Sequence, residues 1–422
     1  MIRIVLINHS FQINYYSRRW ELLAEQHPDL DVTLLAPEKS KWYNSKSYTY
    51  GNGGTVIKGK TVENGNFHIQ LFRKRDVRGS DWYSPDLKKL LLEINPDVVY
   101  HIGSHTQLSL VQIIRIVKKH LPKTKILAFS MRGPHHNLSA RRKKGMSWGA
   151  IKSNLSVALS TQIWRYVKKN VDVFFCHYPA AFNSFREEGW TGPLYIQTQV
   201  GVNLEWFHPD EKARQEIRNK YSIGDSFLFG AAARFSLSKG IDDILNALPV
   251  NGDWKFMIMG SGRDDEIERL HKIVSEKGIE NRVIFPGFVD WYDMTKYWNA
   301  IDCAIHVPRS TQKWVETFSL SIVQAMATAK PIIGNDSGSV PFQIGQDNIL
   351  VKEGDICALH EKMQWVMNNR DEARKIGEKA FDYASRSFSV QHLDDMFYVT
   401  LLDIMNGVYD VRKIDMTEYN TQ

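Results

Sequence analysis

The chain has 422 residues, which is more than one ordinary hydrophobic core accommodates, so we expect two domains. Its 43% hydrophobic and 24% charged residues are typical of a soluble globular protein, and no apolar run approaches the roughly 18 residues that span a bilayer. Cys176, Cys303 and Cys357 lie far apart without a Cys-x-x-Cys spacing. This argues against a disulfide framework and a structural zinc site, and indicates a reducing cytoplasm.

The net charge of +7 is concentrated in one stretch of the first half. Between Val98 and Val171 lie fourteen Lys or Arg and no Asp or Glu, so the remainder holds 40 basic and 47 acidic residues. A solvated surface usually mixes both signs, so this stretch indicates an anionic partner, either a membrane surface or a phosphorylated acceptor. Arg141–Lys144 and the apolar residues up to Trp164 follow the pattern of interfacial helices, so we expect 141–164 to contact anionic lipid. No motif for nucleic acid accompanies the charge.

Short apolar, β-rich runs alternate with helical patterns along the chain, which predicts parallel sheets covered by helices. The strands expected in the first half are Arg3–Asn8, Asp31–Leu35, His68–Phe72, Val98–His101, Lys125–Phe129, Val173–Cys176 and Leu194–Gln197. Those expected in the second half are Phe227–Ala233, Lys255–Met259, Val283–Phe285, Cys303–Val307, Pro331–Gly334 and Ile349–Val351, with helices at Ile241–Leu248, Asp264–Lys277, Ala358–Asn368 and Arg370–Phe388. We place the hinge at Val200–Pro209. The sequence thus predicts two doubly wound α/β domains facing a shared cleft.

Two cations follow the expected strand Phe227–Ala233. Arg234 and Lys239 stand at its carboxyl end, and Gly240 precedes the helix expected next. A diphosphate leaving group gains negative charge as its bond to carbon breaks, and Arg and Lys stabilise that charge without a metal. Gly240 lets the backbone come close, and a helix start attracts phosphate. Surface charges capping a turn are the alternative interpretation.

A carboxylate, Glu316, stands about eighty residues later at the start of an expected helix, and Gln324 follows on that helix. Across eight helical residues the two span about 12 Å, which is close to the reach from a hexose to a ribose across a diphosphate. Glu316 would bind sugar hydroxyls and Gln324 ribose hydroxyls. The free amides of Thr317, Phe318, Ser319 and Leu320 would receive phosphate oxygens. A helix N-terminal acid and an ordinary polar residue are the alternatives.

The second half of the chain resembles the C-terminal domain of the retaining GT-B glycosyltransferases of family 4, the glycosyl transferases group 1. The matching residues, in chain order, are Arg234, Lys239, Gly240, Glu316 and, with a substitution, Gln324. The resemblance runs from Phe227 to Phe388. It implies an N-terminal acceptor-side Rossmann-like domain at 1–208, a nucleotide-sugar-binding Rossmann-like domain at 209–388, and a C-terminal helix at 389–422 that returns to the first domain. It also implies that Gly260 and Gly262 open a helix near the cleft, and that Gly287, Phe288 and Val289 lie beside the nucleobase.

Three departures from the family pattern stand out. Gln324 replaces the usual second Glu, which removes a charge but keeps hydrogen-bonding capacity. The loop after the first strand, 8–14, lacks the glycines that such enzymes place against the donor phosphate. The family's first-domain His falls here in a run where either Arg132 or His135 takes its place, and we favour His135 as the catalytic residue. His101 and His105, near another strand end, are alternative acceptor contacts.

The sequence therefore predicts a retaining, metal-independent glycosyltransferase that moves a sugar from a nucleoside-diphosphate sugar, UDP first and GDP second, to a hydroxyl of a glycan or lipid-linked acceptor. We expect it in the cytoplasm, peripheral to the inner face of the membrane, without a cofactor. Asp29-Leu-Asp31 mimics a metal-binding Asp-x-Asp, but it precedes its strand, so we expect no metal there. The alternatives are a GT-B-type nucleotide-sugar epimerase, which would form product without an acceptor, and a non-catalytic binder of phosphorylated glycans.

Overall fold

A computed structural model describes residues 1–8, 10–11, 14–38, 62–77, 81–131, 148–311 and 314–409. These residues form two compact units. Unit 1 holds the described residues up to Gln199 together with those from Met396 onward, and unit 2 holds Val200–Asp395. None of the described helices is long and apolar enough to cross a membrane.

Unit 1 is built on a mainly parallel sheet in the order β10-β9-β8-β7-β1-β2-β4-β3. Among the described strands of this sheet, β3 alone runs antiparallel to its neighbour, β4. The strands are β1 (Ile2–Ile7), β2 (Leu30–Pro37), β3 (Val62–Asn64), β4 (Phe67–Phe72), β7 (Val98–Ile102), β8 (Lys125–Ser130), β9 (Val173–Cys176) and β10 (Leu194–Ile196), and a separate pair is formed by β5 (Arg75–Asp76) and β6 (Trp82–Tyr83).

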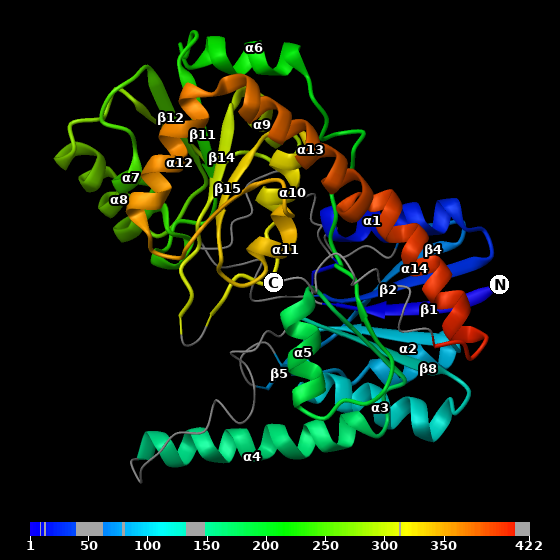
Figure 1. The fold of residues 1–422 in the computed structure, drawn as a ribbon. Coiled ribbons are helices and arrows are strands. Elements are labelled where there is room, and N and C mark those ends of the chain that lie inside the picture. Colours follow the sequence, from blue (N-terminus) through cyan, green and yellow to red (C-terminus); the bar gives the residue numbers. More distant parts are fainter. Residues whose placement is uncertain are drawn as a thin grey trace. The chain divides into compact units, whose positions relative to one another are not determined.

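Helices cover both faces of the unit 1 sheet (Figure 1). They are α1 (Asn14–Gln26), α2 (Leu87–Ile94), α3 (Leu108–His120), α4 (Trp148–Lys168), α5 (Pro179–Glu187) and the second part of α14 (Val390–Met405). Phe397, Leu401 and Ile404 of α14 lie in the same buried core as Trp20 of α1. The last described helix therefore completes the core of the first unit.

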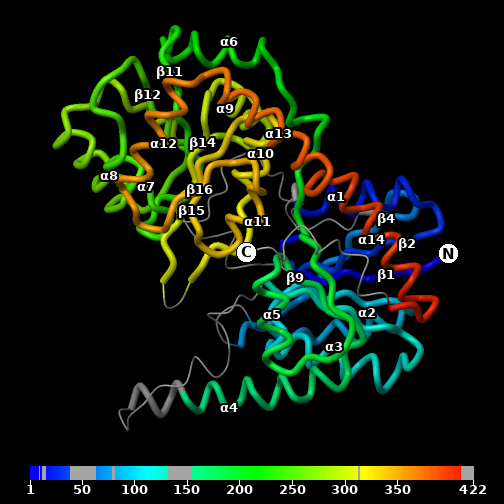
Figure 2. Tube along the Cα trace, in the orientation of Figure 1, coloured from blue at the N-terminus to red at the C-terminus, as the bar shows by residue number. Residues whose placement is uncertain are grey.

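Unit 2 has a parallel sheet in the order β13-β12-β11-β14-β15-β16. Its strands are β11 (Phe227–Ala232), β12 (Trp254–Met259), β13 (Val283–Gly287), β14 (Cys303–His306), β15 (Ile332–Asn335) and β16 (Ile349–Val351). Its helices are α6 (Glu211–Lys220), α7 (Ile241–Ala247), α8 (Asp264–Glu276), α9 (Met294–Ala300), α10 (Leu320–Ala327), α11 (Val340–Ile344), α12 (Ile356–Asn368) and α13 (Arg370–Phe388). Figure 2 follows the same path as a single trace.

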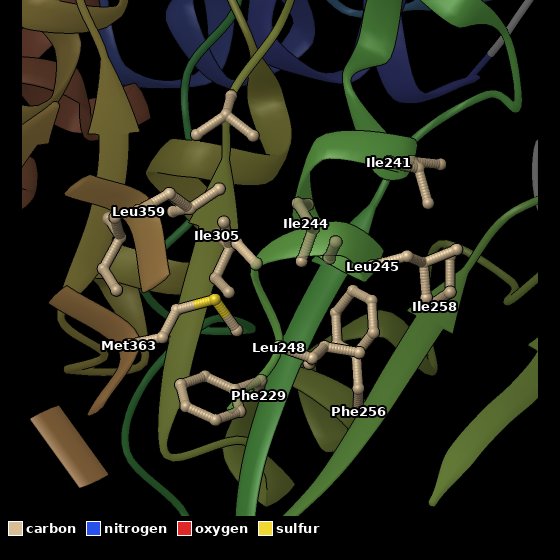
Figure 3. Packing of buried hydrophobic residues seen from close by; sticks show 14 of the residues in the cluster. Phe229, Ile241, Ile244, Leu245, Leu248, Phe256, Ile258, Ile305, Leu359 and Met363 are labelled. Carbon is tan, nitrogen blue, oxygen red and sulfur yellow. The ribbon is translucent and has the colours of Figure 1, made fainter. Parts of the chain in front are cut away.

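The core of unit 2 lies between the sheet and helices α7, α8 and α12. Figure 3 shows Phe229, Phe256 and Ile305 of the strands packed with Ile244 of α7 and Met363 of α12. Because parallel strands are buried on both faces, they appear in the sequence as nearly continuous apolar runs. This explains why every predicted strand is confirmed, with ends that differ by one or two residues.

The strand order of unit 2 reverses between β11 and β14, which are neighbours in the sheet although β12 and β13 lie between them in sequence. In an open parallel sheet, such a reversal leaves a crevice outside the carboxyl ends of the two strands, because their connections leave toward opposite sides. The first motif, which comprises Arg234, Lys239 and Gly240, follows β11. The second motif, which runs from Glu316 to Gln324, follows β14.

Candidate active site at the carboxyl edge of the unit 2 sheet

The first motif forms a tight turn directly after β11. Arg234 is exposed, and a single 3₁₀ turn, Leu237–Lys239, brings Lys239 to the sheet edge. Gly240 ends this turn with φ of 65°, and a Cβ there would collide with the carbonyl oxygen of Val307. Only glycine combines this left-handed conformation with so close a contact. The turn that carries Lys239 is therefore packed on the backbone that leaves β14.

The second motif is not helical at its start, contrary to our expectation. Helix α10 begins at Leu320, so Glu316 lies four residues earlier in a segment without regular secondary structure. Its backbone oxygen accepts a hydrogen bond of 2.9 Å from the amide of Ser339. Gly338 has φ of 58°, and a Cβ there would collide with that same oxygen. The turn after β15 therefore fixes the backbone of Glu316.

The two motifs meet through an ion pair. Nζ of Lys239 lies 2.5 Å from Oε2 of Glu316, and the ammonium lies over the ring of Trp314, 4.6 Å from its centroid. Nε2 of His306, the last residue of β14, lies 3.3 Å from the same Oε2. Glu316 is only 5% exposed. One carboxylate thus joins the segments that follow β11 and β14.

The surroundings of Glu316 keep its side chain ionised. Burial raises the pKa of the carboxyl, but the hydrogen bond from His306 and the charge of Lys239 outweigh it and bring the pKa to about 2. Burial lowers the pKa of His306, and the hydrogen bond with Glu316 opposes this only in part. We therefore assign a neutral imidazole beside a charged carboxylate at neutral pH.

The loop after β14 is hydrogen-bonded to two neighbouring segments, one near Lys239 and one after β15. The amide of Arg309 donates to the carbonyl of Ser238 at 2.9 Å, and its guanidinium pairs with Asp243 at the start of α7. Ser310 Oγ lies 2.7 Å from both Ser337 Oγ and Glu353 Oε2. These contacts connect the turn of Lys239 with the turn that follows β15.

The amides expected to be free are not all free. The amide of Ser319 donates to Oε1 of Gln343 at 2.8 Å, and Nε2 of Gln343 donates to the carbonyl of Ser319 at 3.0 Å. The expectation was therefore wrong for Ser319. Thr317 and Phe318 precede α10, and Leu320 is its first residue. Ser319 is thus held by the side chain of Gln343, whereas Leu320 lies on the helix.

Gln324 lies on α10 and is 3% exposed. Its Oε1 accepts a hydrogen bond of 3.3 Å from Nε1 of Trp298, while its Nε2 is buried without a hydrogen-bond partner among the described residues. A buried amide hydrogen without a partner costs free energy. The arrangement is consistent with a group that bonds a ligand, and it offers that ligand a donor rather than an acceptor.

The glycines assigned to the nucleotide lie along the same sheet edge. Gly260 follows β12, has φ of 138°, and donates its amide to Gly287 at the end of β13 at 2.9 Å. Gly262 packs on Phe235, and helix α8 begins two residues later, at Asp264. Next to Gly287, Phe288 is exposed and Val289 is buried.

The candidate residues of the first half separate into two groups. Arg132 and His135 lie outside the described residues. His101 and His105 are buried in unit 1, where His101 lies 3.3 Å from Ser109 Oγ and His105 lies 3.1 Å from Ser130 Oγ. Both histidines are thus buried and hydrogen-bonded within unit 1. Asp29 accepts from Tyr398 at 2.8 Å at the amino end of β2.

His306 and Trp314 belong to the site but were not anticipated from the sequence. A polar residue at the carboxyl end of an otherwise apolar strand was the available signal for His306. Trp314 carries no comparable signal, because its contact with Lys239 depends on the course of the loop.

Residues 213–383 match the family model described as glycosyl transferases group 1. This segment contains Lys239, Glu316 and Gln324. For this segment of unit 2, the match confirms the resemblance to the glycosyl transferases group 1 that the motifs indicated.

Two curated relatives align with about half of this chain. A GDP-mannose-dependent alpha-(1-6)-phosphatidylinositol monomannoside mannosyltransferase of Mycobacterium tuberculosis is 25% identical over 217 residues, 49% of this chain and 54% of the relative. An N-acetyl-alpha-D-glucosaminyl L-malate synthase of Bacillus anthracis is 24% identical over 202 residues, 46% of this chain and 51% of the relative. These alignments thus span about half the length of each relative.

Among solved structures, HepE of Anabaena, in complex with UDP, has a TM-score of 0.68 at 17% identity and covers 96% of this chain and 100% of its own. Sucrose-phosphate synthase from Thermosynechococcus elongatus has a TM-score of 0.71 at 16% identity, with the same coverage. At such identities the likeness shows the fold alone. The predicted GT-B fold class, with two Rossmann-like units in one chain, is confirmed.

Proposed function

We propose that this protein is a glycosyltransferase that moves a sugar from a nucleoside-diphosphate sugar to an acceptor hydroxyl. The observation that carries the proposal is the pairing of Lys239 with the buried Glu316 at the point where the strand order of unit 2 reverses. A cation there suits a diphosphate, and a carboxylate beside it suits sugar hydroxyls.

In this proposal the ammonium of Lys239 binds the diphosphate, with Arg234 as a second cation. An ammonium has three donors, and Glu316 takes one of them, so two remain for phosphate oxygens. Positive charge from side chains stabilises the leaving group in the role that a divalent metal plays elsewhere, so we propose a metal-independent reaction. The nucleobase lies beside Gly287–Val289.

We further propose that the anomeric configuration is retained. Departure of the diphosphate and entry of the acceptor on the same face need no protein nucleophile, because the leaving phosphate accepts the acceptor proton. Glu316 is a weak nucleophile in this proposal, because the charge of Lys239 and the hydrogen bond from His306 lower the basicity of the whole carboxylate, Oε1 included. Its role is to bind the sugar.

The donor is a UDP- or GDP-sugar. One relative is named as GDP-mannose-dependent, and the HepE structures were solved with UDP and with UDP-glucose, so both nucleotides enter the first test. A differential scanning panel of UDP-glucose, GDP-mannose and the free nucleotides identifies the donor by its stabilising shift. Release of nucleoside diphosphate from that donor, increased by a glycan or lipid-linked acceptor, supports the proposal. Turnover of the sugar without any acceptor, to an epimer, would contradict it.

The acceptor side is proposed to contact an anionic membrane surface through α4 and the basic residues before it. Leu155 and Leu159 on α4 are 71% and 56% exposed, and the helix contains no acidic residue. Val157 and Trp164, which we had expected in the interface, are instead buried. The apolar contact is therefore narrower than the sequence pattern suggested.

A further inference from the structure

Two donors converge on one oxygen of Glu316. Lys239 Nζ lies 2.5 Å and His306 Nε2 lies 3.3 Å from Oε2. A carboxylate oxygen has two lone pairs, so these donors saturate Oε2. No described residue donates a hydrogen bond to Oε1. Within the described residues, Oε2 is thus hydrogen-bonded to the protein, whereas Oε1 can accept a hydrogen bond from a ligand.

The chemistry of the pair fixes the tautomer of His306. An ionised carboxylate only accepts hydrogen bonds, so the proton between the two groups belongs to Nε2. His306 is 8% exposed and neutral at neutral pH, because burial lowers its pKa. It therefore gives Glu316 a hydrogen bond without adding a second positive charge beside Lys239. Lys239 and His306 are the charged or titratable groups that act on Glu316.

We propose that His306 is a positioning residue for the donor sugar: its Nε2–H holds the Glu316 carboxylate so that Oε1 faces the sugar and Lys239 keeps two N–H groups for the diphosphate. The inference rests on the proposed function. Without the imidazole donor, the carboxylate is free to turn and bind the ammonium with both oxygens. Such a turn would remove the acceptor for the sugar and one of the donors for phosphate.

The test compares His306→Leu, which removes the donor at similar volume, with His306→Gln, whose amide N–H reaches a comparable position. His360→Leu is the matched control, because His360 is likewise a hydrogen-bonded histidine of unit 2, with its Nδ1 3.0 Å from the backbone oxygen of Ala247 rather than from Glu316. Calorimetry with UDP, UDP-glucose, GDP and GDP-mannose separates binding of the nucleotide from the added affinity of the sugar. We expect His306→Leu to lower nucleotide-sugar affinity by about ten- to hundredfold, as for a lost hydrogen bond to a charged group, and to lower nucleoside diphosphate affinity less.

A second readout distinguishes positioning from structural support. Losing a donor raises the pKa of Glu316, so nucleotide-sugar binding by His306→Leu should fail at a higher pH than in the wild type. His306→Gln should restore both the affinity for nucleotide-sugar and the pH below which that binding fails. His360→Leu should leave both quantities as they are in the wild type. Equal weakening of nucleotide and nucleotide-sugar, or a folded His306→Gln that behaves like His306→Leu, would overturn the inference and leave the proposed function intact. If the wild type binds none of these ligands, the proposed function fails first.

Discussion

At the scale of single residues, the site depends on a buried pair of opposite charges. Removing one partner of such a pair leaves an uncompensated charge, which costs more than the pair itself contributes. Glu316 is buried and Lys239 is its cationic partner. Lys239 therefore supports the fold besides its proposed contact with the diphosphate, and experiments on it must separate the two roles.

Lys239→Ala should lower turnover at least tenfold, since charge-assisted hydrogen bonds contribute about 1.5–3 kcal/mol. It should also lower the free energy of unfolding, because Glu316 then lacks its cation. Lys239→Ala combined with Glu316→Gln should recover stability but not activity. Chemical denaturation and initial rates on the same preparations check this double-mutant cycle. Full activity in a folded Lys239→Ala protein would remove the residue from the mechanism.

Glu316 should also give the protein a specific pH dependence. Its pKa is about 2 in the folded protein and is higher when the chain is unfolded, so its stabilising effect is complete above about pH 4.5 and is lost as pH falls toward 2. The shift corresponds to roughly 3 kcal/mol. Denaturation of wild type and Glu316→Gln should show a difference at neutral pH that shrinks in acid. A difference that stays constant down to the acid unfolding limit would refute this assignment.

At the scale of secondary-structure elements, the segments that follow β11, β14 and β15 pack against one another through close backbone contacts. Gly240 lies against Val307, and Gly338 lies against Glu316. The strands themselves were predictable because each is a local apolar run. The start of α10 was not predictable, because the backbone of Glu316, outside the helix, is held by a hydrogen bond from Ser339, which is distant in sequence. The contact of His306 with Glu316 is likewise tertiary, so no local pattern reveals it.

Gly338→Ala tests this arrangement against a matched substitution. Gly354 also has a positive φ, 78°, but a Cβ there meets open space, so Gly354→Ala should cost only the strain of the conformation, about 1–2 kcal/mol. Gly338→Ala should cost more and weaken nucleotide-sugar binding, because it displaces the backbone of Glu316. Denaturation and calorimetry compare the two variants. Equal losses of stability with unchanged binding would show that the turn does not position Glu316.

At the scale of the whole molecule, the two units differ in charge and in proposed task. The stretch between Val98 and Val171, which has no acidic residue, belongs to unit 1. The residues proposed to bind the donor, Lys239 and Glu316, belong to unit 2. The sequence revealed this asymmetry directly, because charge is a property of composition. It did not reveal which apolar residues of α4 are exposed, since that depends on packing: Trp164 donates to the carbonyl of Glu188 and is buried.

Changing Arg141–Lys144 to Ser should weaken binding to anionic vesicles and transfer to a membrane acceptor. Binding of the wild type should fall steeply with salt, because exposed charges are screened within about 10 Å at roughly 0.1 M. Donor hydrolysis in solution should survive the change. Vesicle sedimentation and nucleotide release on one variant separate the two effects. Lost hydrolysis with intact vesicle binding would assign these residues to the reaction instead of the membrane.

Titrating UDP-glucose and GDP-mannose in excess chelator shows whether Lys239 and Glu316 form a donor site without a metal. The proteins compared are the wild type and the folded double variant Lys239→Ala/Glu316→Gln. We expect the wild type to bind one of these donors despite the chelator and the double variant to lose this binding. A wild type that binds only after manganese is restored, or a double variant that binds as tightly as the wild type, would contradict this expectation.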